Sequence, residues 1–126
     1  MDATIVFPNQ LFNSSPALSR KRKIFILQDP LFFSDTEYPA LFHKNKILLH
    51  LLSIDYYRQE LSDYGYDVQI IEVEQLQNKD SYISFFKKNN ITEIYFCDPV
   101  DYVITKRLDI ATKKLKLKTY KYDTPL

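Results

Sequence analysis

Polar and aromatic side chains able to recognise a ligand are concentrated in three short segments within the first 43 residues of the 126-residue sequence. Amides and carboxylates can satisfy the N–H and C=O groups of a ring, and aromatic side chains can stack on its faces. Together they are the chemistry of a pocket for a planar, polar heterocycle. The candidate ligand-binding residues are Asn9, Gln10, Gln28, Asp29, Tyr38 and His43.

Each candidate residue also has an ordinary structural interpretation. Asn9 and Asp29 belong to residue types that often bond to their own backbone in turns. A histidine near a helix start, such as His43, is commonly a surface side chain. No serine, cysteine or second acid is positioned by the sequence to form a catalytic triad with it. We therefore predict a binding site and no catalytic residue.

The rarest residue types exclude several classes of cofactor. Gly65 is the only glycine, whereas phosphate-binding loops need several glycines so that the backbone can approach phosphate. Cys97 is the only cysteine, and with His43 and His50 it has no recognised zinc spacing. We predict no classical NAD or ATP site, no internal disulfide and no metal centre.

Charge and hydropathy exclude two further classes. Seventeen basic against sixteen acidic residues give a net charge of +1, far from the balance of a chain built mainly to hold nucleic acid. The apolar segment 3–7 is too short for a signal peptide, and the stretch 47–54, interrupted by His50, is far below a membrane span. The sequence therefore predicts a cytoplasmic protein without a membrane partner.

Short apolar runs alternate with segments of helical periodicity along the chain. Gly65 stands where a residue in the left-handed conformation would end a long helix. Asp98 and Pro99 indicate the start of the last helix of the chain. The predicted core face of the long helix is Ile47, Leu51, Ile54, Arg58 and Leu61, with Leu48 and Leu52 alongside. The predicted strands are 4–7, 24–27, 67–73, 93–97 and 117–122, and the predicted helices are 41–64, 82–88 and 98–115.

Strands that alternate with helices through short connections favour a parallel sheet covered on both faces. We therefore predict a single domain over residues 1–126. Its fold is a three-layer, doubly wound, Rossmann-like α/β fold with a mainly parallel sheet of about five strands. Such folds bind ligands beyond the carboxyl ends of their strands. The loops after Phe7, Leu27 and Phe96 are therefore the expected ligand site.

Several segments, taken in order, resemble a known family. The segments that carry the resemblance are 5–11, 25–29, 38–47, 56–61 and 65–68. They are similar to the amino-terminal domain of the cryptochrome/photolyase-related proteins of the bacterial iron–sulfur group, and the resemblance spans nearly the whole chain. In that family this domain holds an antenna chromophore, commonly a ribityllumazine, which passes excitation to a flavin. The resemblance implies the same role for the six candidate residues.

The sequence departs from the family pattern at the proposed pocket. The family carries a Gly-Asp-Gln-Leu loop after the first strand, where this sequence has Pro8 and Asn9 in place of Gly-Asp. The usual glutamate after the second strand is replaced by Gln28, followed by Asp29. The family's His-Lys-x-Lys entry to the long helix is matched at 43–46.

In that family FAD, the iron–sulfur cluster and the DNA lesion are held by a helical carboxyl-terminal part, which has no counterpart in these 126 residues. The resemblance therefore implies a chain that is inactive in repair on its own. The partner of this chain would be that helical part, and the chain would meet DNA only through the helical part.

Three other interpretations compete with the antenna domain. A receiver-type regulatory domain needs acids after its first strand, where Asn9 stands, and an aspartate after its third strand, where the sequence at 74–76 is Glu-Gln-Leu. A nucleic-acid module would use the basic run 20–23 and the lysines between 113 and 121, which a solvated sheet edge also explains. A stand-alone ligand-binding or protein-interaction module without a chromophore remains an open alternative.

Overall fold

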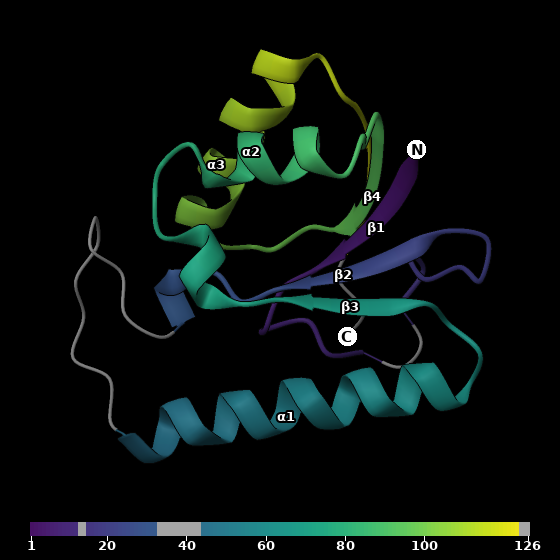
Figure 1. Ribbon diagram of the computed structural model, residues 1–126, viewed down its shortest axis with the longest axis vertical. Coiled ribbons are helices and arrows are strands. Elements are labelled where there is room, and N and C mark those ends of the chain that lie inside the picture. The colour runs from purple at the N-terminus through teal and green to yellow at the C-terminus, as the bar shows by residue number, and fades with distance from the viewer. Residues whose placement is uncertain (13–14, 33–43, 124–126) are drawn as a thin grey trace.

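The computed structural model describes residues 1–12, 15–32 and 44–123 of the chain (Figure 1). Its centre is a five-stranded, all-parallel sheet with the strand order β3-β2-β1-β4-β5. This arrangement confirms the predicted α/β fold. The strands are β1 (Asp2–Val6), β2 (Lys23–Leu27), β3 (Val68–Ile71), β4 (Glu93–Cys97) and β5 (Lys118–Tyr122). The helices are α1 (Lys44–Asp63), α2 (Ser81–Lys88) and α3 (Tyr102–Leu115), with 3-10 turns at Pro30–Phe32 and Val73–Leu76.

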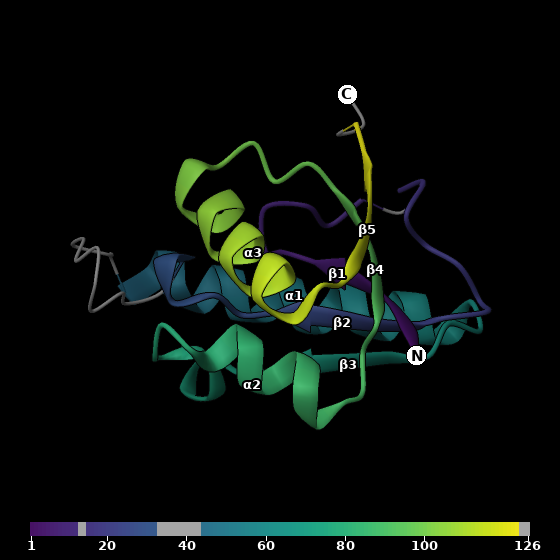
Figure 2. The same cartoon turned by 90° about the horizontal axis from the view of Figure 1, so that it is seen from above.

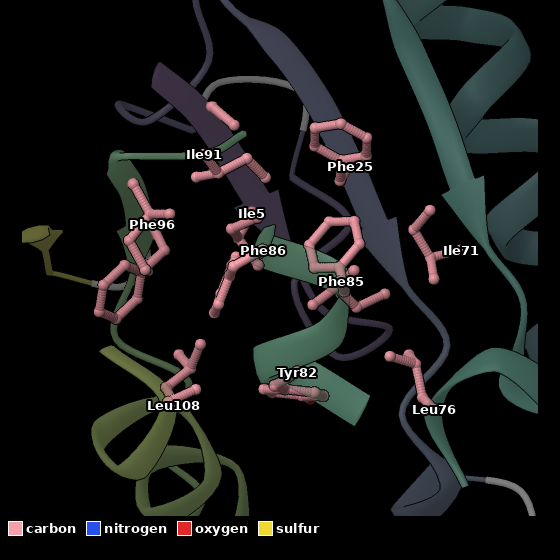
Figure 3. Close-up of a cluster of buried hydrophobic side chains, with 14 of the residues drawn as sticks. Ile5, Phe25, Ile71, Leu76, Tyr82, Phe85, Phe86, Ile91, Phe96 and Leu108 are labelled. Carbon is pink, nitrogen blue, oxygen red and sulfur yellow. The ribbon is translucent and has the colours of Figure 1, made fainter. Parts of the chain in front are cut away.

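The helices form two layers on opposite faces of the sheet. Helix α1 lies along one face, and α2 and α3 lie on the other (Figures 1 and 2). Each face has its own apolar core. On the α1 face, Ile24 and Ile26 pack with Ile54 and Leu61. On the other face, the largest cluster combines residues of β1, β2, α2, β4 and α3 (Figure 3).

The aromatic centre of the larger cluster explains why the short helix α2 is stable. An eight-residue helix is marginal by itself and depends on tertiary packing. In α2, Phe85 and Phe86 are buried, with ring centroids 5.3 Å apart. The Phe85 ring also meets the Phe25 ring of β2 edge-on, at 5.0 Å and 83° (Figure 3). Aromatic contacts thus hold α2 against the middle of the sheet.

The carboxyl end of α1 follows the sequence prediction. Gly65 adopts a φ of +90°, the amide of Tyr66 donates to the carbonyl of Leu61 at 3.0 Å, and the amide of Gly65 donates to Ser62 at 3.0 Å. This pair of hydrogen bonds is the Schellman motif, which favours glycine. Arg20 donates to the Tyr64 carbonyl from Nε and Nη2 at 2.9 and 2.7 Å, so this basic side chain also closes the helix end.

Several predicted element boundaries were wrong. The last helix begins at Tyr102, not at Asp98, because Asp101 is its cap: Asp101 Oδ1 accepts from the amides of Val103 and Ile104 at 2.9 and 3.1 Å. Asp98 forms a separate turn by accepting from the Val100 amide at 2.9 Å. The third strand is shorter than predicted, since a 3-10 turn starts at Val73. The predicted helix residues 41–43 lie outside the described residues.

The predicted core face of α1 was partly wrong. Ile54 and Leu61 are buried as expected, and Ile47 and Arg58 are half-buried. In contrast, Leu48, Leu51 and Leu52 are exposed to solvent. The buried side of the helix is completed instead by Tyr57. The helix thus has apolar residues on both its inner and its outer side.

Candidate functional site

The strand order defines where a ligand site belongs. From β1 the chain first moves outward to β2 and β3, and it then crosses back to β4 and β5 on the other side of β1. Ligands of such sheets bind outside the carboxyl ends of the strands, at the point where the order reverses. We call the loops at this end, residues 7–12, 28–32 and 98–101, the carboxyl edge.

Asn9 and Gln10 lie at the reversal point, where they tie β1 to β4. Gln10 is buried, and its Nε2 donates to the carbonyls of Cys97 and Asp98 at 3.0 and 2.9 Å. Asn9 is exposed, and its Nδ2 donates to the carbonyl of Pro99 at 3.1 Å. Because both amides satisfy carbonyls at the end of a neighbouring strand, they fix the relative position of the two loops.

Gln28 and Asp29 lie at the end of β2, where they contact other elements. The Oε1 of Gln28 accepts from the amide of Val73 at 3.1 Å, which holds the turn after β3. The Asp29 carboxylate is fully buried. It forms an ion pair with Arg107 of α3 and accepts a hydrogen bond from the Tyr82 hydroxyl of α2. The turn after β2 is completed by the Leu31 amide, which donates to Asp29 Oδ1 at 2.9 Å.

The sequence did not predict the two partners of Asp29 at the candidate site. Arg107 and Tyr82 come from two different helices, 78 and 53 residues further along the chain. One sequence signal points to Arg107: it is a charged residue beside the apolar stripe of Ile104 and Leu108. A charged side chain next to a buried stripe often snorkels toward a polar partner at the rim of the core.

The remaining two candidates, Tyr38 and His43, lie outside the described residues. Of the four described candidates, the structure joins Asn9 and Gln10 to the end of β4. It joins Gln28 and Asp29 to β3, α2 and α3. In the described part of the chain there is no cluster of three or more His, Cys, Asp or Glu side chains that could hold a metal ion.

The amides at the carboxyl edge keep some hydrogen-bonding capacity. Among the described residues, the Asn9 and Gln10 side chains bond only through their amino groups. The Gln28 side chain bonds only through its oxygen. Each primary amide carries two donors and an acceptor oxygen. The edge therefore offers two acceptor oxygens from Asn9 and Gln10 and an amino group from Gln28.

The basic run 20–23 is used within the fold. Arg22 Nη2 donates to the carbonyl of Ala17 at 2.7 Å, and Arg22 Nε donates to the Thr4 hydroxyl at 3.1 Å. Its guanidinium carbon lies 3.6 Å from the centroid of the Tyr95 ring. Thr4 in turn donates to Ala17 at 2.7 Å. Since Arg20 also caps α1, two of the four charges in the run 20–23 have structural roles.

Tyr57 connects α1 to the loop that leaves the carboxyl edge. Its hydroxyl donates to the Phe12 carbonyl at 2.7 Å. Burial raises the pKa of this hydroxyl above its ordinary range, and the nearby Cys97 and Glu60 add to the effect. The neutral form of Tyr57 is therefore the form that the folded state holds.

We expect Tyr57 to make the fold less stable at alkaline pH. A raised pKa in the folded state means that its contribution is fully present below about pH 10 and is lost as the pH rises toward the raised value. Chemical unfolding between about pH 9 and about pH 12 should show a steeper fall of the unfolding free energy for the wild type than for Tyr57→Phe. The difference in slope should reach up to about 1.4 kcal/mol per pH unit.

The matched control is Tyr64→Phe, at an exposed tyrosine just beyond the end of the same helix. It should keep the alkaline slope of the wild type. If Tyr57→Phe and the wild type lose stability in parallel, Tyr57 does not carry this pH dependence.

Within the described residues, no helix has the length and apolarity needed to cross a membrane. Fold and site together define a class: a doubly wound, parallel α/β domain with polar side chains in the loops at its strand ends.

Comparison with known proteins identifies the family within this class. The sequence model of the deoxyribodipyrimidine photo-lyase-related proteins matches residues 4–126, and the chain belongs to that family. The chain is also similar to the "Uncharacterized protein R852" of Acanthamoeba polyphaga mimivirus, with 30% identity over 125 residues. That match covers 96% of this chain and 63% of the relative, so the chain spans less than two thirds of the relative's length.

Proposed function

We propose that this chain is the antenna-chromophore-binding domain of a photolyase-related flavoprotein and that it holds a planar heterocycle of the ribityllumazine type at the carboxyl edge. The observation that carries the proposal is the set of amide groups of Asn9, Gln10 and Gln28 at the ends of adjacent strands β1 and β2. Membership of the photolyase-related family supports the same role.

The available atoms match the polar edge of such a ring. The side-chain oxygens of Asn9 and Gln10 can accept from ring N–H groups, and the amino group of Gln28 can donate to a ring carbonyl. Tyr38 and His43 complete the proposed set of ligand-binding residues. We assign Asp29 a positioning role, because its charge is already paired with Arg107 and it holds the turn that directly follows Gln28.

The rest of the activity would belong to another part of the protein. FAD, an iron–sulfur cluster and contact with DNA are proposed for a helical carboxyl-terminal partner. The chain by itself would then bind the antenna and carry out no repair. A chromophore held between two domains loses one wall in the isolated chain, so we expect weak binding.

The proposal predicts a change in affinity at one side chain. Titration of the chain into 6,7-dimethyl-8-ribityllumazine, followed by fluorescence anisotropy, should give saturable binding. Gln28→Ala should weaken it about fivefold, because one hydrogen bond to a ring is worth about 1 kcal/mol. The control is Gln69→Ala, at an exposed glutamine of the neighbouring strand β3, which should bind as the wild type does. Equal affinities of all three proteins would contradict a role for Gln28.

One observation favours the alternative, an interaction module without a chromophore. Gln10 and Asp29 are both buried and both bond to other parts of the fold, so the carboxyl edge has a structural use even without a ligand. In that case lumazine would not bind saturably, and the helical partner would still bind.

A further inference from the structure

Helix α1 exposes an unusual number of large apolar side chains on the side that faces away from the sheet. They are Leu48, Leu49, Leu51, Leu52 and Tyr56, with exposed fractions of 54, 64, 39, 59 and 72%. Single exposed apolar residues are normal on a protein surface, whereas contiguous groups mark interaction sites. Five such residues within nine positions of one helix therefore indicate an interaction site.

We call the exposed apolar residues of α1 the stripe, and three of them are regularly spaced. Leu48, Leu52 and Tyr56 follow one another at intervals of four residues, which places them on one side of the helix over about 12 Å of its length. The opposite side of α1 contacts the sheet through Ile54 and Leu61. In Figure 1, α1 forms a layer of its own, and its outer side is turned away from the rest of the described chain.

An open groove runs beside the stripe. It has a volume of about 840 Å³, and its lining includes Leu11, Leu52 and Tyr56 together with Asp55 and Glu60. The groove could receive apolar side chains from a second helix that packs along α1. This is the helix-in-groove mode of recognition, in which side chains spaced three and four residues apart provide the anchors.

The stripe and the charges of α1 are complementary to themselves in an antiparallel arrangement. Leu48 and Tyr56 are equally distant from Leu52, so an antiparallel copy centred on Leu52 brings each leucine opposite a tyrosine. By sequence, the lysines of the helix are confined to its first three residues, whereas its second half carries Asp55, Glu60 and Asp63 against Arg58 alone and so keeps a negative net charge. Antiparallel packing sets the lysine end of one helix against the acidic end of the other, and parallel packing sets like charges side by side.

We propose that the outer face of α1 is a homodimer interface in which two copies pack antiparallel about a twofold axis at Leu52. Such an isologous contact uses the same surface on both copies. The interface lies on the outside of the α1 layer and borders the carboxyl edge at Leu11, which lines the groove. Dimerisation is tested without ligand, so its test does not depend on the proposed chromophore. A contact of one helix and its groove is at the small end of specific interfaces, which predicts a dimer of modest affinity.

Sedimentation equilibrium over a range of concentrations tests the proposal. The mass should rise from 15.0 kDa toward twice that value, 2 × 15.0 = 30.0 kDa, as the concentration approaches roughly 100 μM. Leu52→Lys should weaken association at least tenfold. The control is Ile110→Lys on α3, where the replaced residue is 53% exposed and association should be unchanged. Circular dichroism should show the same helix content in all three proteins.

Cysteine cross-linking tests the antiparallel arrangement. Leu52→Cys should form a covalent dimer under mild oxidation, because the two copies of this position meet at the axis. Leu48→Cys should cross-link at least tenfold more slowly, because it lies opposite Tyr56 of the second copy. The native Cys97 is 3% exposed and should not compete.

Three results would overturn the proposal. The first is a mass of 15.0 kDa at every concentration, which would indicate that a different partner, such as the proposed carboxyl-terminal helical part, covers these residues. The second is a dimer that Leu52→Lys does not weaken. The third is cross-linking of Leu48→Cys as fast as that of Leu52→Cys, which would indicate a parallel arrangement.

Discussion

Replacing Asp29 with alanine is expected to lower the free energy of unfolding by about 3–5 kcal/mol, because it removes one partner of a buried ion pair. The Asp29 carboxylate is fully buried, and the side chain of Arg107 is 19% exposed. The substitution removes the carboxylate that pairs with the Arg107 guanidinium and accepts from the buried Tyr82 hydroxyl. Chemical unfolding followed by circular dichroism measures the loss.

The control for this prediction is the exposed ion pair of α1. Arg58 and Asp55 lie 3.1 Å apart, and the side chain of Asp55 is 68% exposed. Asp55→Ala should change the unfolding free energy by about 1 kcal/mol or less, since exposed pairs are worth little. If Asp29→Ala and Asp55→Ala destabilise the protein equally, Asp29 is not the link between β2, α2 and α3 described above.

Phe86→Ala is the second substitution with a large expected effect, a loss of about 3–5 kcal/mol in unfolding free energy. The Phe86 side chain is fully buried in the cluster of Figure 3, and its ring contacts those of Phe85 and Tyr82 at 5.3 and 6.5 Å. Alanine leaves a cavity beneath a helix that depends on packing. Because α2 carries Tyr82, the loss should also loosen the hydrogen bond to Asp29.

Thermal and chemical unfolding can separate the packing effect from a general effect of mutation. Phe86→Leu, which fills part of the cavity, should recover a substantial part of the loss. Tyr102→Ala, at a tyrosine of α3 that is 78% exposed, should change stability by no more than about 0.5 kcal/mol. A Phe86→Ala protein as stable as Tyr102→Ala would contradict the assignment of Phe86 to the core.

Local patterns in the sequence were sufficient for the fold class. The apolar runs that became β1, β2 and β4 are short and almost fully buried, as expected for parallel strands covered on both faces. The end of α1 was equally predictable, since Gly65 is the only residue of the chain that adopts a left-handed conformation without a side-chain penalty. These features depend on residues close together in the chain.

The orientation of α1 could not be predicted in the same way. Between residues 47 and 52 the helix is apolar at every position except His50, so helical periodicity there does not say which side faces the sheet. Ile54 and Tyr57 are buried because the twisted sheet meets the helix there, and Leu48 and Leu52 are left outside. That choice depends on the position of β2 and β3 beneath the helix, which no local pattern contains.

The candidate site was predictable in its location but not in its internal bonds. The alternation of strands and helices predicts that the loops after β1 and β2 lie at one edge, and the structure places Asn9, Gln10, Gln28 and Asp29 in those loops. The bonds of Asp29 to Tyr82 and Arg107 join residues more than fifty positions apart. Such contacts follow from the packing of two helices, and a single sequence gives only weak signs of them.

The most direct test of the antenna role is to map the amide resonances of the ¹⁵N-labelled chain during titration with 6,7-dimethyl-8-ribityllumazine. An antenna-binding domain should show saturable shifts confined to the carboxyl edge, in residues 7–12, 28–32 and 98–101, together with the segment that holds Tyr38 and His43. Shifts that cluster at 113–121 instead, or no saturable shift at millimolar ligand, would contradict the antenna role.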